Sequence, residues 1–195
     1  MPTEMSGVLL AQAFSPVHHP AALLAGEAVA RQLAPRQLAE RFAVQAEEHS
    51  LLIPARLNFA SADLHLTESD VAWPFARALH SRSTNGFERQ RAARDLLTDL
   101  QPWATPFVVA LIGEYVIEIL DDIAAALTPE TTRTLSTFIS QNEAYWKTTK
   151  RRVMSYWNEY YRWHSRDQTG GGQYVGFKLI AALETAASER TLLGT

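Results

Sequence analysis

The sequence predicts an all-α fold, and three observations support that prediction. Apolar residues recur at spacings of three and four residues through most of the chain, as they do on one face of a helix. Pro and Gly residues fall between these segments and mark short turns. The longest apolar segment, residues 103–127, is apolar on all sides except one strip, which is typical of a helix enclosed by other helices. We therefore expect a single domain, residues 1–195, built from about seven or eight helices arranged largely as antiparallel pairs.

Composition limits the class of protein further. The chain is 47% hydrophobic, which is enough for a substantial core, and its net charge of −3 gives no overall attraction to nucleic acid or to an anionic membrane. The absence of Cys from the sequence excludes disulfides, thiolate nucleophiles and zinc sites built on Cys. The first residues, MPTEMSGVLL, place no Lys or Arg before an apolar patch, so we expect no signal peptide, no membrane partner and a cytoplasmic protein.

The N-terminal quarter is expected to be helical after a short irregular start. Residues 1–19 should be loosely ordered, because two prolines near their end hold the chain extended. Residues 20–53 are expected to form a helical hairpin, since Leu38, Phe42 and Ala46 recur at spacings of four in its second half.

The next segment combines a short extended stretch with a helix pair. Alternating apolar and polar residues at 55–66 predict a minor hairpin or an extended loop. Helices over 70–80 and 87–100 should follow, with Gly86 in the turn between them. The stretch STNGFERQRAARDLLTDL resembles the second helix of a HEAT-type repeat. This resemblance covers about one repeat within residues 70–127, and it implies an antiparallel helix pair but no particular function.

The core helices are expected to extend from residue 70 to residue 164. The last elements in order are a central helix at 103–127, a short helix at 131–139, a long helix at 143–164, a Gly-rich linker at 165–173 and a final helix at 174–190.

An acidic strip on the central helix is the first candidate site. Glu114, Glu118, Asp121 and Asp122 fall within about 100° on a helical wheel. Glu114 and Glu118, one turn apart, could bind a divalent metal or act as acid/base groups. The simpler interpretation is a solvated face, or a face paired with arginines of the preceding helix. The sequence contains no His pair at zinc spacing, no nucleophile elbow and no phosphate-binding glycine motif, so we expect no cofactor.

The long helix at 143–164 is the second candidate site, because it carries three of the five Trp residues, four Tyr residues and a basic run. Aromatic and Arg side chains are enriched at protein interfaces. The side chains expected to contact a partner are Tyr145, Arg151, Arg152, Tyr156, Tyr161 and Trp163. The alternative is that the aromatic residues belong to the core and the cations form a solvated face.

Three functions remain open at this point. The leading hypothesis is a non-enzymatic protein-interaction module or scaffold that binds another protein or a second copy of the chain. The alternative is a small-molecule or metal-dependent enzyme with a pocket in a helical bundle around Glu114 and Glu118. A third hypothesis is nucleic-acid binding through helix 143–164, which the net charge disfavours.

Overall fold

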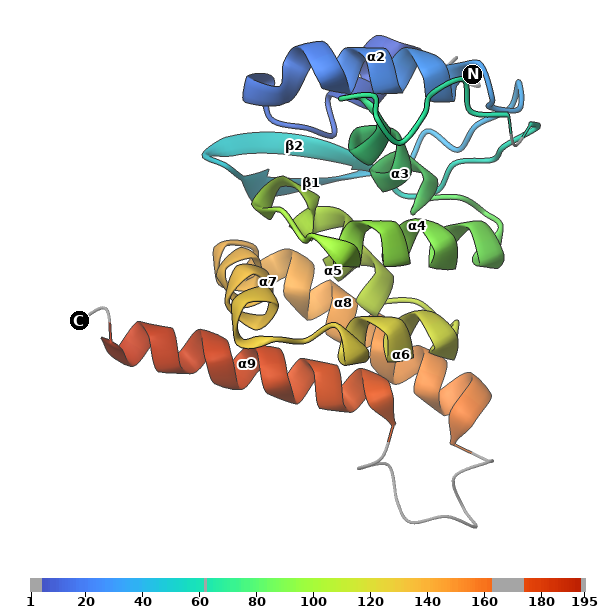
Figure 1. Ribbon diagram of the computed structural model, residues 1–195. Coiled ribbons are helices and arrows are strands. Elements are labelled where there is room, and N and C mark those ends of the chain that lie inside the picture. Colours follow the sequence, from blue (N-terminus) through green and yellow to red (C-terminus); the bar gives the residue numbers. More distant parts are fainter. Residues whose placement is uncertain (1–4, 62, 163–173, 194–195) are drawn as a thin grey trace. The chain divides into compact units, whose positions relative to one another are not determined.

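The computed structural model describes residues 5–61, 63–162 and 174–193 (Figure 1). Within these ranges the fold is mostly helical, as predicted, with nine α-helices and one two-stranded antiparallel sheet. No helix in the described ranges is both long and apolar enough to cross a membrane. The chain divides into two compact units, residues 1–107 and residues 108–195, and each is described by itself. The expected single domain stays a prediction.

Unit 1 begins with helices that pack closely on each other. The elements are α1 (Gly7–Ala11), the 3₁₀ turn η1 (Pro16–His18) and α2 (His19–Ala30). The expectation of a loosely ordered start is wrong for this segment, because Leu10 and Phe14 are buried and anchor it. Helices α1 and α2 approach most closely at Gly7 and Gly26, where a Cβ on Gly26 would lie 2.4 Å from the Gly7 carbonyl oxygen.

A β-hairpin follows α2, so the prediction of a helical hairpin over 20–53 is wrong in its second half. Strand β1 (Arg41–Ala46) pairs antiparallel with β2 (His49–Pro54), and Val44 lies opposite Leu51 in the register. Buried and exposed residues alternate at the end of β1, the period of a strand rather than of a helix. Glu47 and Glu48 form the turn with positive φ angles of 49° and 65°, as a type I′ turn requires.

The minor hairpin expected near 55–66 is therefore found earlier in the chain, over residues 41–54. Residues 55–66 contribute isolated bridges instead, with Leu33 paired to Phe59 and Leu57 paired to Ser83.

The predicted helix pair of unit 1 is confirmed as α3 (Trp73–His80) and α4 (Gly86–Thr98), which pack together. The Asn85 side chain caps α4 by accepting a hydrogen bond from the Phe87 N–H.

The expected central helix over 103–127 is interrupted, and the prediction of one continuous helix is therefore wrong. The chain forms a 3₁₀ turn η2 (Pro102–Ala104), then α5 (Thr105–Ile112) and, after a break, α6 (Ile117–Ala125). Helix α5 is buried throughout, as the apolar sequence predicts. Val116 adopts an extended conformation at the N-cap of α6, which ends the regular hydrogen bonding between the two helices.

The rest of unit 2 consists of three longer helices. They are α7 (Pro129–Gln141), α8 (Glu143–Tyr156) with its π-helical continuation η3 (Trp157–Tyr161), and α9 (Val175–Leu193). Thr128 caps α7 in a capping box, so the helix begins two residues before the predicted range of 131–139. Helix α9 packs against α6, α7 and α8 (Figure 1). The expected linker at 165–173 lies outside the described residues.

Candidate functional site

Five tyrosines from four segments of unit 2 form a contiguous group, which we call the tyrosine cluster. Its members are Tyr115, Tyr156, Tyr160, Tyr161 and Tyr174. The ring of Tyr115 lies 5.7 Å from that of Tyr156 and 5.8 Å from that of Tyr160, between centroids. The rings of Tyr161 and Tyr174 stack at 5.2 Å. Aromatic pairs at such distances contribute about 0.5–1.5 kcal/mol each beyond their burial.

Two local irregularities of the backbone bring these tyrosines together. The break between α5 and α6 places Tyr115 outside both helices. The π-helical turn η3 carries Tyr160 and Tyr161 at the end of α8. The Tyr161 hydroxyl donates a hydrogen bond to the backbone carbonyl of Tyr115 and so joins the two irregular segments. Single π-helical turns are frequent at functional sites.

The cluster is buried on one side and open on the other. Tyr174 is only 7% exposed, whereas Tyr115 is 44% exposed and Tyr160 is 51% exposed. Met154, on the preceding turn of α8, adds a side chain that is 49% exposed. The inner rings therefore fix the position of outer rings that solvent or a partner can reach.

The phenols of the inner part of the cluster stay protonated at neutral pH. Burial, followed by the nearby charge of Tyr161, raises the pKa of Tyr174 to about 12. Burial also raises the pKa of Tyr161, and the carboxylates of Glu118 and Asp121 add to that effect. These two carboxylates therefore place negative charge beside the tyrosine cluster, and the neutral phenols keep their O–H groups as donors.

The predicted partner-binding residues differ in burial, and only some of them belong to the tyrosine cluster. Tyr156 and Tyr161 belong to the tyrosine cluster, and Arg151 is exposed on α8, where it donates to the Thr148 hydroxyl. Arg152 is half-buried. Tyr145 is also half-buried and packs edge-on against Phe138 of α7, so it serves the core rather than the surface. Trp163 lies outside the described residues.

The acidic strip predicted on the central helix is divided by the break, because Glu118, Asp121 and Asp122 share a face of α6 whereas Glu114 lies outside that helix. Glu114 is 1% exposed and lies in the break after α5, whereas Glu118 is exposed in the first turn of α6. The assumed spacing of one helical turn between their carboxylates is therefore wrong. In the described part of the chain, no group of three or more His, Cys, Asp or Glu side chains could hold a metal ion. Metal binding by Glu114 and Glu118 stays a prediction without a preformed ligand set.

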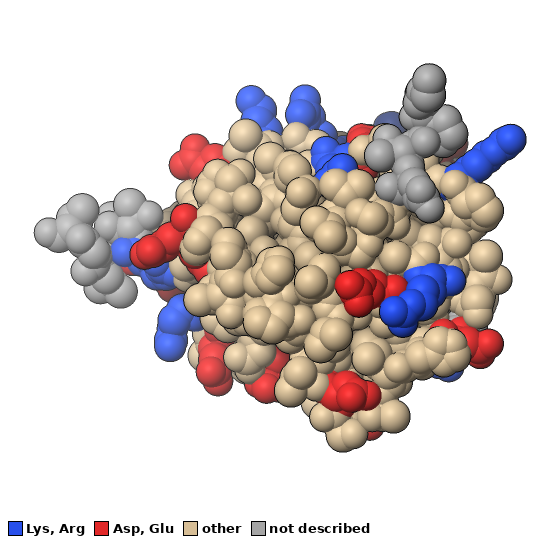
Figure 2. All heavy atoms as spheres, turned by 90° about the horizontal axis from the view of Figure 1, so that it is seen from above, with Lys and Arg blue, Asp and Glu red and all other residues tan. Residues whose placement is uncertain are grey.

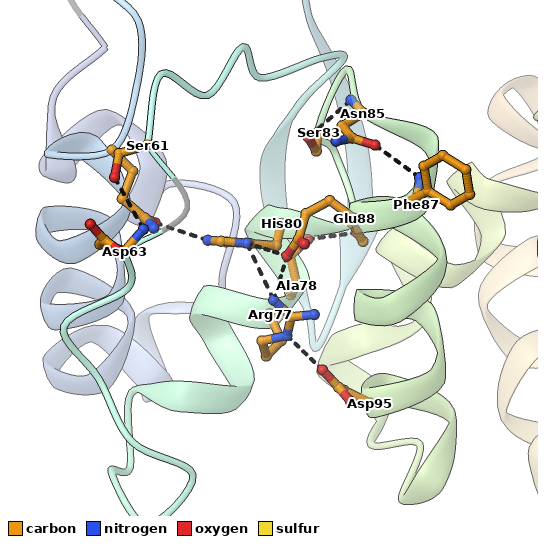
Figure 3. A network of polar contacts seen from close by, with 12 residues as sticks. Ser61, Asp63, Arg77, Ala78, His80, Ser83, Asn85, Phe87, Glu88 and Asp95 are labelled. Carbon is orange, nitrogen blue, oxygen red and sulfur yellow. Dashed lines mark hydrogen bonds and ion pairs between the residues drawn. The ribbon is translucent and has the colours of Figure 1, made fainter.

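Unit 1 contains an ionic network that the sequence analysis missed (Figure 3). Its members are Gln32, Arg77, His80, Glu88 and Asp95. Arg77 is 4% exposed and contacts two carboxylates, Glu88 Oε1 at 2.7 Å through Nη1 and Asp95 Oδ2 at 2.6 Å through Nε. His80 is 3% exposed and lies between Glu88 Oε1, 2.7 Å from Nδ1, and Gln32 Oε1, 2.9 Å from Nε2. The network thus connects α3, α4 and the segment that follows α2.

The geometry of the ionic network favours stabilisation over acid–base catalysis. The hydrogen bond from His80, together with the hydrogen bond and charge of Arg77 and against the opposing effect of burial, lowers the pKa of Glu88 to about 2. Glu88 is therefore a carboxylate at neutral pH and a poor proton acceptor. Both ring nitrogens of His80 point at oxygen atoms, which leaves neither nitrogen for a substrate.

Charges of both signs are interspersed on the face of the molecule that carries α2 (Figure 2). Most of the described surface in this view belongs to uncharged residues, and Lys or Arg side chains lie mainly near its edge. Nucleic-acid binding usually requires a continuous basic patch. The described residues on this face form no such patch.

No protein-family model, no curated protein and no solved structure matches the chain. The resemblance of residues 70–127 to a HEAT-type repeat therefore stays a prediction.

The sequence predicts part of the tyrosine cluster and none of the ionic network. The composition of the segment YWNEYY drew attention to α8 and η3. Tyr115 and Tyr174 were missed, because each is a single Tyr in an unrelated segment. A possible signal for the network was the unusual spacing of Arg77 and His80 on the buried side of α3, since charged residues at apolar positions need partners.

Proposed function

We propose that the protein is a non-enzymatic binding protein that recognises another protein through the tyrosine cluster, and that a second copy of the chain is the first partner to test. The observation that supports this proposal is the exposure of Tyr115 and Tyr160, whose rings pack against the half-buried ring of Tyr156. Tyr side chains offer large contact area at a low cost in conformational entropy, because they have only two rotatable side-chain bonds.

The surroundings of the cluster favour a partner that has charges of both signs. Arg162 is exposed directly after Tyr161 at the end of η3, whereas Glu118 and Asp121 are exposed on α6. In a symmetric dimer the same patch lies on both subunits, so basic groups of one copy can meet acidic groups of the other. A second copy of this chain is therefore a partner that carries charges of both signs.

The acidic side of the cluster also makes nucleic acid a poorer partner. Glu118 and Asp121 would face the phosphates of any strand whose bases stacked on Tyr161. Binding to a nucleic acid would depend steeply on salt concentration, whereas binding dominated by tyrosine contacts would not. Repeating the association measurement at high salt separates these two cases.

Sedimentation velocity of the full chain tests the proposal. We expect the wild-type chain to dimerise within concentrations of about 1 μM to 1 mM, which correspond to binding free energies of about −8 to −4 kcal/mol. The variant carrying both Tyr115→Ala and Tyr160→Ala should associate at least about tenfold more weakly, as expected for removal of interface hot spots. Phe87→Ala is the matched control, because Phe87 is 87% exposed but lies in unit 1.

Two results would contradict the proposal in different ways. Equal association of the wild type and the double tyrosine variant would show that the tyrosine cluster is not the interface. A wild-type chain that stays monomeric throughout would exclude self-association and leave a different protein as the only partner of the cluster. Binding to a different protein is then tested by a pull-down experiment that compares the proteins retained by the immobilised wild type with those retained by the double tyrosine variant.

A further inference from the structure

A second candidate binding site lies in unit 1, where the N-terminus of α3, the end of α4 and the turn η2 enclose a pocket of about 240 Å³. We call it the tryptophan pocket. The residues that matter for the argument are Trp73 from α3, Trp103 from η2, and Asp95 and Asp99 from the end of α4. None of them belongs to the tyrosine cluster.

Three aromatic side chains, Trp73, Phe75 and Trp103, contribute to the lining of the tryptophan pocket. Trp103 is 9% exposed and stacks on Phe75, with ring centroids 4.4 Å apart, so its orientation is fixed by packing. Trp73 already holds a cation, because the central guanidinium carbon of Arg77 lies 5.6 Å from its ring centroid. Indole rings bind cations better than other aromatic side chains do.

The net charge of the residues that line the tryptophan pocket is negative, because Arg77 pairs with Asp95 and the carboxylate of Asp99 remains. Asp95 accepts a hydrogen bond from Arg77 Nε at 2.6 Å, and Arg77 also pairs with Glu88 outside the pocket. Asp99 Oδ1 accepts a hydrogen bond at 2.8 Å from the neutral side chain of Gln101. Among the described residues, Asp99 has no cationic partner. Its charge is therefore available to a ligand.

Size, aromatic walls and an uncompensated carboxylate together define a ligand class. The pocket is larger than the cavity of about 150 Å³ that holds benzene, and smaller than the pockets of about 300–1,000 Å³ that hold drug-sized molecules. Aromatic rings beside a carboxylate are the arrangement that recognises organic ammonium groups. We propose that the tryptophan pocket binds a small organic cation, an alkyl- or arylammonium compound that places its charge at Asp99 and its apolar body between the two tryptophans.

A titration followed by NMR tests this proposal on the full chain. The probe is benzyltrimethylammonium, a permanent cation, and benzyl alcohol serves as the neutral probe of similar shape. We expect the indole N–H signals of Trp73 and Trp103, assigned through single Trp→Phe variants, to shift saturably with the cation at constant ionic strength. Benzyl alcohol should shift them at least about fivefold less strongly at equal concentration, because it lacks the charge that Asp99 attracts.

Charge-removing variants locate the binding. Asp99→Asn should weaken binding of the cation about two- to fivefold, since an exposed carboxylate is removed from the site. Asp63→Asn is the matched control, because Asp63 is exposed, lies in the same unit and does not line the tryptophan pocket. Circular dichroism of each variant checks that the helix content is unchanged.

Three outcomes would overturn the proposal. Equal shifts with the neutral and the cationic probe would show an apolar cavity without preference for charge. Absence of saturable shifts would show that the pocket binds neither probe. Equal weakening by Asp99→Asn and Asp63→Asn would show that only the general charge of the molecule matters. None of these outcomes bears on the tyrosine cluster, so the two proposals fail or succeed separately.

Discussion

Replacing Glu88 by glutamine tests whether the ionic network stabilises unit 1. Glutamine has nearly the same shape as glutamate but lacks the charge that Arg77 and His80 share. Arg77 would keep Asp95 as its only carboxylate partner, and the hydrogen bond at His80 Nδ1 would lose its ionic character. The substitution therefore removes an electrostatic contribution and leaves the packing of α3 and α4 in place.

The size of the effect follows from the pKa of Glu88. The network lowers that pKa from 4.5 to about 2, and each pH unit of such a difference corresponds to about 1.4 kcal/mol, so the charged form is favoured by roughly 3 kcal/mol. Removing one member of a buried ion pair typically costs about 3–5 kcal/mol. The Glu88 side chain is 25% exposed, which places the expected loss of unfolding free energy at the lower end, about 2–3 kcal/mol at neutral pH.

The same pKa predicts how the effect depends on pH. A carboxyl group whose pKa is lowered by folding stabilises the folded state above its unfolded pKa, here 4.5, and this stabilisation is lost as the pH falls toward 2. Over that interval the wild type should therefore lose about 2–3 kcal/mol of unfolding free energy, a contribution that the Glu88→Gln variant lacks at every pH. The difference between the two proteins should be largest at neutral pH and should shrink toward pH 2.

Urea denaturation followed by far-ultraviolet circular dichroism measures both quantities. Glu68→Gln is the control, because Glu68 is exposed in the same unit, and its substitution should change stability by less than about 0.5 kcal/mol. A loss below about 1 kcal/mol for Glu88→Gln at neutral pH would refute the reasoning. A difference between wild type and variant that does not change between neutral and acidic pH would refute it as well.

Two further predictions concern the backbone of unit 1. Gly26→Ala should destabilise the protein by at least about 2 kcal/mol, because the new Cβ would lie 2.4 Å from the Gly7 carbonyl oxygen and neither backbone can move freely. Thermal melting measures this loss of stability. Gly113→Ala is the control and should destabilise the protein much less, because its Cβ would meet nothing closer than 3.5 Å. Glu48→Gly should stabilise the hairpin by about 0.5–1 kcal/mol, because φ is 65° at that position and Gly adopts positive φ without strain. A lower urea midpoint for Glu48→Gly than for the wild type would contradict this second prediction.

Most helices could be predicted from the sequence because their signals are local. Helices α3, α4 and α7 follow from apolar spacing and from caps such as Thr128, which need no knowledge of the rest of the chain. The hairpin could not be read in the same way. Leu38, Phe42 and Ala46 fit a helix by their spacing, and Phe42 and Ala46 fit one face of a strand equally well. Its turn also contains no Gly or Asn, the usual sign of a tight hairpin.

The candidate sites depend on contacts that no local pattern records. Gln32 joins His80 from 48 positions earlier in the chain, and the Tyr161 hydroxyl reaches the Tyr115 carbonyl across 46 positions. The break after α5 has a weak sequence signal, a single Gly113 inside an apolar run, and an apolar helix with one Gly is common. Composition therefore indicated which segment of unit 2 was unusual, but not which surface it forms.

The tyrosine cluster forms where regular helical hydrogen bonding stops, and this has a physical reason. A continuous helix over 103–127 would have kept Tyr115 on a helical face, and a regular end of α8 would have lacked the wider turn that carries Tyr160 and Tyr161. Interruptions of this kind cost free energy and persist only when surrounding contacts compensate for them. Here the compensation is the set of stacked rings and the bond between the Tyr161 hydroxyl and the Tyr115 backbone. The rings of Tyr115 and Tyr160 pack on this set and at the same time expose part of their surface, which a partner can contact. Their removal should therefore weaken association and also lower folding stability through the lost ring pairs.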